Sequence, residues 1–467
     1  MKKKAWLVIV PWPTVGHLAS AVEAANLLLE KDDQFSVNVI VLMRSSDSTL
    51  ASYTDALTVT DRFRFIKIPM AEADSFDLNL TQNYKAEVKD AVSNLISTSD
   101  IPLAGFVIDM FSSPIIDVAD EFGVPSYIYF TTTAVFLGLM FHLLVLSDEQ
   151  KVDLSQLKDS TNDAVFDLHV LSKPLPARFL PYLVFSEEML SSMNDNTRRC
   201  RRAKGILLNS FMELESNAIK SLSDGELPPI YPIGPVLHLE SGSGSDGGVY
   251  QQEIINWLDD QPSSSVIFLC FGSIGCFDED QVKEIASALE QCGHRFLWSL
   301  RRPPPKEKTM DYPTDYENPA EVLPAGFLDR TAQIGKIIGW APQTAILGHP
   351  ATGGFVSHCG WNSVLESLWY GVPIATWPIY SEQQVNAFEL VDELGLAVEI
   401  KMDYRKESEM IVKAEIIERG IRNLMENYEI RKKVKKMSRK SKIALMDGGS
   451  STCSLGRLIE DLMNKLT

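Results

Sequence analysis

Short apolar runs alternate with helical patterns along this chain, and this alternation restricts the fold more than any other feature. Alternating β and α elements imply a mostly parallel sheet that is covered by helices on both faces. In the first half of the chain the expected strands are Trp6–Val10, Ser36–Leu42, Phe63–Ile68, Gly105–Ile108, Ser126–Phe130 and Gly205–Asn209, and the expected helices are His17–Glu30, Tyr84–Ser97 and Ile115–Phe122.

A second alternating series follows a stretch rich in glycine and serine at residues 240–249, which is typical of a flexible linker. Residues 301–320 are expected to form an exposed loop, and two or three further helices are expected before the end of the chain. The expected strands are Ser265–Phe271, Arg295–Ser299, Lys336–Gly339, Gly354–Ser357 and Ile374–Trp377, and the expected helices are Asp280–Gln291, Asn362–Tyr370 and Gln383–Leu394.

The two series predict an α/β protein with two Rossmann-like domains that face each other across a cleft. A chain of 467 residues is too long for one ordinary core. We expect an N-terminal domain at residues 1–239 and a C-terminal domain at residues 240–446. Ligands of such sheets bind beyond the carboxyl ends of the strands.

Composition excludes several classes of protein. The net charge of −18 argues against nucleic acid as a partner, and the basic run from Arg431 to Lys442 is interpreted as a solvated helix face. The six cysteines include no CxxC pair, which suits a reducing compartment, and Cys359 is expected to be a small buried residue. The apolar run at residues 5–10 is too short for a secretion signal.

The uncharged segment Tyr127–Leu146 has the length of a membrane span. It is interrupted by Thr131, Thr132 and Thr133, so we predict a strand, a turn and a buried helix instead. The protein is therefore expected to have no membrane span and to be cytoplasmic.

The segment Trp340–Gln383 contains a junction that fits a phosphate-bearing ligand. The apolar run Gly354–Ser357 ends in His358-Cys359-Gly360-Trp361-Asn362-Ser363, and an amphipathic helical pattern follows. A helix N-terminus carries unpaired N–H groups and a partial positive charge, both of which favour phosphate.

The same segment resembles the 44-residue nucleotide-sugar box of the plant family 1 UDP-glycosyltransferases, and the resemblance covers nearly the whole chain. It is closest to the branch that acts on flavonoids and other small plant phenolics. The resemblance implies the two-domain GT-B architecture, in which the last helix, at about 447–467, packs back on the N-terminal domain. Outside the box it rests on Gly16-His17, Asp109 in VIDMF, FGS at 271–273 and DGGSS at 447–451.

For the donor, the resemblance implies UDP-glucose. It implies that His358, Asn362, Ser363 and Ser273 contact the phosphates, and that Trp361 belongs to the same site. Trp340 offers a face for uracil, while the Ala341 backbone, Gln343 and Glu366 bond the base and ribose. Glu382 and Gln383 grip sugar hydroxyls, with Gln383 favouring glucose, and Thr131 aligns with a hydroxyl residue that reaches the sugar. Taken alone, Asn362 and Ser363 would be helix caps, Trp340 could equally be a core residue or a stacking platform, and Glu366 would be a surface charge.

For the chemistry, His17 follows the first expected strand and Asp109 ends another. If those strands are neighbours, the carboxylate can bond the far nitrogen of His17, so that the imidazole removes a proton from a hydroxyl acceptor. Displacement of UDP from the opposite face then inverts the sugar to a β-glucoside. No metal is expected, because His358 and the helix N-terminus would do the work of a cation.

Several alternatives stay open. A dinucleotide oxidoreductase would need GxGxxG where residues 11–16 read PWPTVG, and a P-loop enzyme would need GxxxxGK[ST]. A sugar-on-sugar transferase, a terpenoid or carboxylate glycosyltransferase, and a non-catalytic UDP-sugar-binding protein remain possible on the sequence. The expected acceptor is a small hydrophobic hydroxylated molecule, bound by loops near 70–90, 136–145 and 175–195, with Trp12 narrowing the pocket. We expect a monomer.

Overall fold

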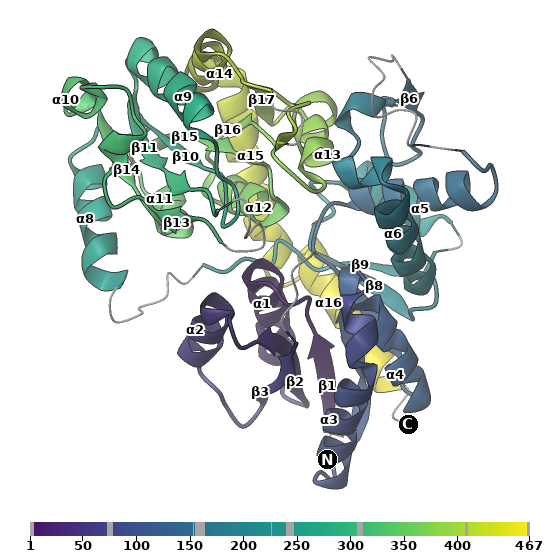
Figure 1. Ribbon diagram of the computed structural model, residues 1–467. Helices are drawn as coiled ribbons and strands as arrows, with labels where there is room; N and C mark the ends of the chain where they lie inside the picture. Colours follow the sequence, from purple (N-terminus) through teal and green to yellow (C-terminus); the bar gives the residue numbers. More distant parts are fainter. Residues whose placement is uncertain are drawn as a thin grey trace.

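Two parallel sheets form the framework of the molecule in the computed structural model (Figure 1). The structure describes residues 4–71, 78–152, 154, 164–225, 227–239, 247–305, 312–406 and 410–464. Residues 240–246, which include most of the predicted linker, lie outside the described residues, so the predicted boundary between the two domains stays a prediction.

The first sheet has seven strands in the order β3-β2-β1-β4-β5-β8-β9, and every neighbouring pair is parallel. Apart from the edge strand β3, in which Arg64, Lys67 and Pro69 are exposed, its strands are largely buried on both faces and read as continuous apolar runs. They are β1 (Ala5–Val10), β2 (Phe35–Arg44), β3 (Phe63–Met70), β4 (Leu103–Asp109), β5 (Ser126–Phe130), β8 (Gly205–Leu208) and β9 (Ile230–Pro232).

The second sheet has six parallel strands in the order β14-β11-β10-β15-β16-β17. These strands are β10 (Val266–Cys270), β11 (Arg295–Ser299), β14 (Gly335–Ile338), β15 (Thr352–Ser357), β16 (Ile374–Thr376) and β17 (Ala397–Glu399). All predicted strands are therefore confirmed to within a few residues, whereas β9 and β17 were missed. Each of these two edge strands has only three residues, which is too few to show a period.

The helices of the N-terminal half are α1 (Val15–Lys31), α2 (Ser48–Ala56), α3 (Lys85–Ser97), α4 (Ile116–Glu121), α5 (Ala134–Asp148), α6 (Glu187–Cys200) and α7 (Ser216–Ser223). Those of the C-terminal half are α8 (Gly247–Asp259), α9 (Glu279–Cys292), α10 (Phe327–Thr331), α11 (Gln343–Gly348), α12 (Trp361–Tyr370), α13 (Gln383–Phe388), α14 (Ala414–Glu426), α15 (Tyr428–Leu445) and α16 (Ser450–Asn464). A π-helical turn, Glu389–Glu393, continues α13.

The segment that matched a membrane span in length is confirmed as strand β5, a threonine turn and the buried helix α5. Among the described residues, no helix combines the length and the apolar character that crossing a membrane requires. The prediction of an exposed loop at 301–320 is wrong in part. Arg301–Arg302 (β12) and Thr314–Asp315 (β13) pair as an antiparallel ribbon, while residues 306–311 lie outside the described residues. Two-residue strands leave no pattern that a sequence can reveal.

The last helix returns to the first sheet. Helix α16 contacts β9, β4 and α1, and in Figure 1 its yellow ribbon lies among the strands of that sheet. Its apolar side chains join one core cluster with residues of β1, which are separated from them by more than 400 positions in the chain. Those side chains of α16 are Leu455, Leu458, Ile459 and Leu462.

Candidate active site

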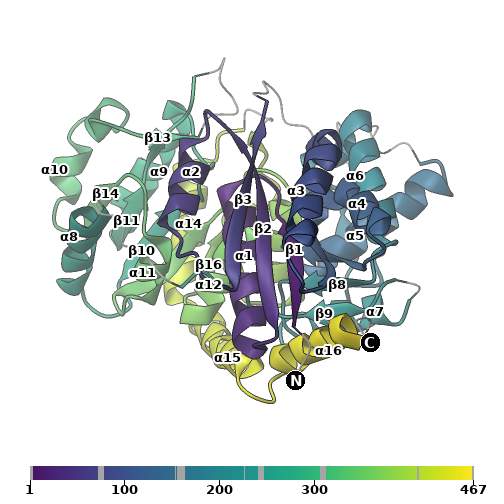
Figure 2. The ribbon, with the colours of Figure 1, turned by 90° about the horizontal axis from the view of Figure 1, so that it is seen from below.

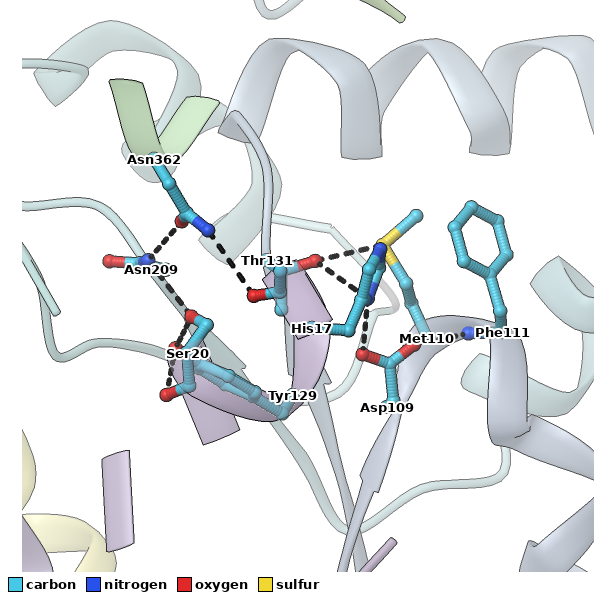
Figure 3. A network of polar contacts seen from close by, with 10 residues as sticks. His17, Ser20, Asp109, Met110, Phe111, Tyr129, Thr131, Asn209 and Asn362 are labelled. Atoms are coloured by element: carbon cyan, nitrogen blue, oxygen red, sulfur yellow. Dashed lines mark hydrogen bonds and ion pairs between the residues drawn. The ribbon is translucent and has the colours of Figure 1, made fainter. Parts of the chain in front are cut away.

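A histidine and an aspartate meet at the carboxyl ends of the two neighbouring strands β1 and β4. Val10 is opposite Ile108 in the register, so the loop after β1 passes beside Asp109, the last residue of β4. His17 lies in the first turn of α1, and its Nδ1 is 2.7 Å from Oδ2 of Asp109 (Figure 3). The sequence predicted this contact on the condition that the strands be neighbours, and they are.

The surroundings of His17 set its protonation. Burial lowers the pKa of His17, but the charge of Asp109, its hydrogen bond and the charge of Glu382 outweigh burial and raise that pKa above 6.5. Asp109 is buried, and its Oδ1 also accepts the Phe111 N–H at 2.9 Å, so the carboxylate is fixed. The His17 side chain keeps 24% of its exposure. With Nδ1 bonded to Asp109, Nε2 is the ring nitrogen that remains for an external proton.

The junction after β15 differs in one respect from the prediction. The N-cap of α12 is Gly360, with no side-chain capping bond, and the helix begins at Trp361. Asn362 and Ser363 are therefore the second and third residues of the helix and not its caps. The reason is Cys359, which is buried and has a φ of 64°, so the chain turns earlier than the residue types suggest. The N–H groups of the first turn are left for a ligand.

His358 lies against this helix start and is only 5% exposed. Its Nδ1 has no hydrogen-bond partner, and its ring fits between two glycines: a Cβ on Gly272 would lie 2.6 Å from Nε2, and one on Gly360 would lie 2.5 Å from it. Burial lowers the pKa of His358 to about 4. Burial thus favours the neutral imidazole, which can contribute a hydrogen bond to a ligand at this helix start.

Strand β10 supplies the opposite wall of the junction. Cys270 is opposite Ser357 in the register, so the Phe271-Gly272-Ser273 turn passes directly beside His358. Ser273 is half-buried in that turn. The structure thus brings together Ser273, His358 and the start of α12, as the sequence predicted for one phosphate-binding region.

The residues expected at the nucleoside end also gather. The Nε2 of Gln343 donates to Oγ of Ser363 at 2.8 Å and to a carboxylate oxygen of Glu366 at 2.7 Å. Burial raises the pKa of Glu366 to about 7. Trp340 is 48% exposed, so of the two interpretations that its residue type allowed, the core residue is excluded, and the adjoining Ala341 is buried.

Arg301 is a residue of this site that sequence reasoning missed. Its guanidinium carbon lies 5.1 Å from the centroid of a Trp340 ring, and its Nε is 2.9 Å from Asp315. The β12–β13 ribbon thus fixes one face of the indole by a cation–π contact. The available signal was an arginine two residues beyond strand β11, but it fell inside the segment that was interpreted as a loop.

The remaining predicted residues join the two halves of the chain. Oε1 of Glu382 accepts from Oγ1 of Thr132 at 3.3 Å, whereas Thr131 Oγ1 is 3.5 Å from Nδ1 of His17. The side-chain Oε1 of Gln383 accepts the backbone N–H groups of Ile379 and Tyr380, which leaves the side-chain Nε2–H groups for a ligand.

Two residues at the start of α12 reach the first sheet directly. The Asn362 Nδ2 donates to the Gly16 carbonyl at 3.4 Å, and the Trp361 indole donates to the Asn209 carbonyl at 2.6 Å. The Asn209 side chain also donates to Oδ1 of Asn362 at 3.5 Å (Figure 3). The Trp361 indole is therefore occupied by the contact between the sheets, and a ligand could meet only its backbone.

Two buried carboxyl groups, one from each half of the chain, lie near these contacts. Burial raises the pKa of Glu215, and burial together with the charge of Glu215 raises the pKa of Glu389. The two shifts favour the protonated, neutral form of these buried carboxyl groups. Oε1 of Glu215 also accepts the Val135 N–H at 3.2 Å. The pair therefore lies between the start of α5, which follows Thr132, and the π-helical turn that continues α13, whose N-cap is Glu382.

The chain matches known proteins along its whole length. The family model described as UDP-glucoronosyl and UDP-glucosyl transferase matches residues 241–441. The chain is 52% identical to UDP-glycosyltransferase 71A15 of Malus domestica, over 99% of this chain and 100% of that protein. It is also 52% identical to UDP-glucose flavonoid 3-O-glucosyltransferase 6 of Fragaria ananassa, over 99% of each chain.

Among solved structures, UGT71G1 of Medicago truncatula complexed with UDP-glucose superposes with a TM-score of 0.85 at 36% identity, over 98% of each chain. The fold is therefore GT-B, as predicted. The sequence similarity and the structural superposition both extend over nearly the whole chain, including both sheets. The chain thus belongs to the plant family 1 UDP-glycosyltransferases and is a glycosyltransferase enzyme.

Proposed function

We propose that this enzyme transfers glucose from UDP-glucose to a hydroxyl group of a small phenolic acceptor of the flavonoid class, with inversion to a β-glucoside. The observation that carries the proposal is the His17–Asp109 pair, 2.7 Å apart, at the start of one sheet's first helix, beside the helix start that holds His358. The Asn362–Gly16 contact of 3.4 Å joins these two regions. A base and an anion site that face each other at this range suit a sugar diphosphate between them.

The proposed step begins with the acceptor hydroxyl. Nε2 of His17 takes the proton as the oxygen attacks the anomeric carbon, and the bond from that carbon to the diphosphate breaks with its electron pair on UDP. Asp109 holds the Nδ1–H and stabilises the imidazolium that forms. Attack from the face opposite the leaving group inverts the configuration.

The donor is proposed to bind along α12. The diphosphate meets the N–H groups of the first turn, the hydroxyls of Ser363 and Ser273, and the imidazole of His358, whose Nε2 side faces Gly272 and Gly360. Uracil stacks on the exposed face of Trp340, opposite Arg301. These fixed N–H and O–H groups oppose the charge that develops on the leaving group, so we propose that no metal takes part.

The sugar is proposed to lie between the two halves. The carboxylate of Glu382 accepts from the sugar hydroxyls, and the side-chain amide N–H of Gln383 donates to them. Thr131 lies beside the base. Glu366 bonds the ribose once Gln343 shifts to share it, while the Ala341 backbone bonds the base. The similarity to a flavonoid 3-O-glucosyltransferase and to a structure with UDP-glucose supports this donor and acceptor class.

Aromatic side chains beside the base support a flat acceptor. The Phe111 ring lies 5.7 Å from the His17 ring, and Trp12 meets Phe111 edge-on at 5.8 Å. Trp12 is buried and supports the partly exposed Phe111, and an aromatic ring next to a general base favours a phenol over an aliphatic alcohol, because planar rings stack on it. We further propose a cytoplasmic location, since thiols such as Cys200 and Cys270 are free, and we propose that the enzyme acts as a monomer.

The first test is an acceptor panel. We expect the highest kcat/KM with UDP-glucose and a flavonol or other phenol, with terpenoid alcohols, carboxylic acids and sugars well below. The proton coupling at the anomeric carbon of the product reports the β configuration. Turnover only with sugars, terpenoids or acids would replace the acceptor class, and binding of UDP-glucose without turnover on any acceptor would make the protein a binder. The same assay in excess EDTA should retain its rate; a loss that Mg²⁺ restores would contradict the metal-free step.

The pH dependence tests the base. His17 must be neutral to accept a proton, so kcat/KM should fall as pH drops through the His17 pKa, at an apparent value above 6.5. In Asp109→Asn the charge and hydrogen bond that raise this pKa are lost, so the acid limb should move to lower pH while the plateau falls about 10²-fold or more. An acid limb that stays in place in this variant would remove Asp109 as the partner of the base.

A further inference from the structure

Helix α15 carries a concentration of cations that the acidic character of the chain makes unusual. The net charge of the protein is −18, yet this helix of 18 residues has eight basic side chains and a single acidic one, Glu429. The basic residues are Arg431, Lys432, Lys433, Lys435, Lys436, Arg439, Lys440 and Lys442.

Two of these cations have partners within the fold. Arg431 donates to the Gly353 carbonyl at 2.8 Å, and the Lys442 ammonium lies 5.4 Å from a Trp369 ring. The other six form no ion pair with any carboxylate in the described part of the chain. Neighbouring helices use their cations differently: Arg422 of α14 meets Glu418 at 2.7 Å, and Lys283 of α9 meets Glu279 at 2.7 Å. Other cations of the chain also lack an ion pair, but α15 gathers six of them on one helix.

The helical period places these cations on one outward face. The buried side chains of α15 are Val434, Ser438, Ser441 and Ala444, which face α12 and α16. At 100° per residue, the direction opposite to them is occupied by Lys432, Lys436, Arg439 and Ile443, with Lys435 and Tyr428 to one side. In Figure 2, α15 lies beside α16 at the lower edge of the molecule.

Large apolar side chains are exposed on the same face. Tyr428 is 70% exposed and Ile443 is 55% exposed, and Met446, directly after the helix, is 61% exposed. They stand at the two ends of the cationic stretch, about 22 Å apart along the helix axis. A helix face that only contacts water gains nothing from three such side chains, because exposing apolar surface to water is unfavourable.

We propose that the outer face of α15 docks this enzyme on a membrane surface that contains anionic lipids. A helix that lies flat in the headgroup region needs basic side chains for the lipid phosphates and aromatic or aliphatic side chains for the acyl boundary, and α15 presents both. Nucleic acid would use the cations alone and leave Ile443 and Met446 in water. The overall negative charge does not prevent the contact, because salt screens charges beyond about 8 Å.

The position of α15 leaves the reaction site accessible. Oγ of Ser438 donates to the Trp369 carbonyl at 2.6 Å, so α15 lies against the C-terminal end of α12. The phosphate-binding region is at the opposite end of α12, about 15 Å away along its axis. In a docked enzyme the length of α12 would therefore separate the membrane-binding face from the phosphate-binding region.

The test is co-sedimentation of the full chain with phosphatidylcholine vesicles that contain either none or 30% phosphatidylserine. We expect binding only to the anionic vesicles, with a loss at high salt. One variant neutralises four outward cations of α15: Lys432→Gln, Lys435→Gln, Lys436→Gln and Arg439→Gln. The matched control neutralises four exposed cations elsewhere: Arg64→Gln, Lys151→Gln, Lys204→Gln and Lys220→Gln.

The α15 variant should bind anionic vesicles at least tenfold more weakly, because each lysine near such a surface contributes about fivefold. The control should stay within about twofold of the wild type. Ile443→Asp, with all cations in place, should also weaken binding. Unchanged glucosyl transfer in solution shows that each variant is folded. Equal vesicle binding by both quadruple variants, no vesicle binding by the wild type, or binding to an RNA homopolymer in its place would overturn the proposal.

Discussion

Replacing His17 by Ala is expected to lower kcat by about 10²–10⁴-fold while the Kd for UDP stays unchanged. The reason is that Nε2 is the nitrogen that receives the proton of the acceptor, while the contacts proposed for UDP come from α12 and the turn after β10. The predicted loss is in the chemical step and not in donor binding. Steady-state kinetics on the best acceptor, together with calorimetric titration of UDP, separate the two.

The chain offers a matched control for this variant. His349 also faces an aspartate, with Nε2 at 3.1 Å from Asp259, but it lies after α11, away from the site described above. His349→Ala should therefore leave kcat within about twofold. If His17→Ala retained full activity, His17 would not be the base; if UDP binding fell in parallel, the role of His17 would be structural.

Gly272→Ala is expected to raise the Kd for UDP and the KM for UDP-glucose by about tenfold or more. The added methyl group would lie 2.6 Å from Nε2 of His358, closer than real Cβ atoms approach, so the ring must move away from the phosphate-binding region. The φ of Gly272 is 77°, so the substitution also costs about 1–2 kcal/mol in backbone strain.

A second glycine separates these two effects. Gly293 has a φ of 67° at the C-terminal end of α9, and a Cβ built there meets nothing within 4 Å. Gly293→Ala should therefore lower the melting temperature to a similar degree as Gly272→Ala but leave UDP binding unchanged. Equal UDP affinity in both variants and in the wild type would mean that His358 does not contact the diphosphate.

Much of the framework could be predicted from the sequence, because buried parallel strands are continuous apolar runs that end at glycine or polar residues. The order of the strands could not be predicted in the same way. The contact between His17 and Asp109 depends on β4 lying next to β1, although β2 and β3 intervene in the chain. That arrangement is a property of tertiary packing, so the sequence could give the two residues but not their distance.

The errors have local physical causes. Helix α12 starts within one residue of its predicted start, but its cap is Gly360 and not Asn362, and nothing in the residue type of Cys359 signals the positive φ that precedes this cap. Three adjacent threonines could not be ranked, and only the structure shows Thr132 at Glu382 and Thr131 at His17. Arg301 was missed because the two short strands that position it are separated in the chain by residues 303–313.

The return of α16 to the first sheet has a consequence for folding during synthesis. Leu455, Leu458 and their neighbours cover apolar surface of β1 and α1, which leave the ribosome long before α16. More than 400 residues are added before that cover arrives, and at 5–20 residues per second this takes about 20–80 s. During that period the newly made N-terminal half exposes apolar surface that α16 later covers. We therefore expect chaperones to bind this half during translation.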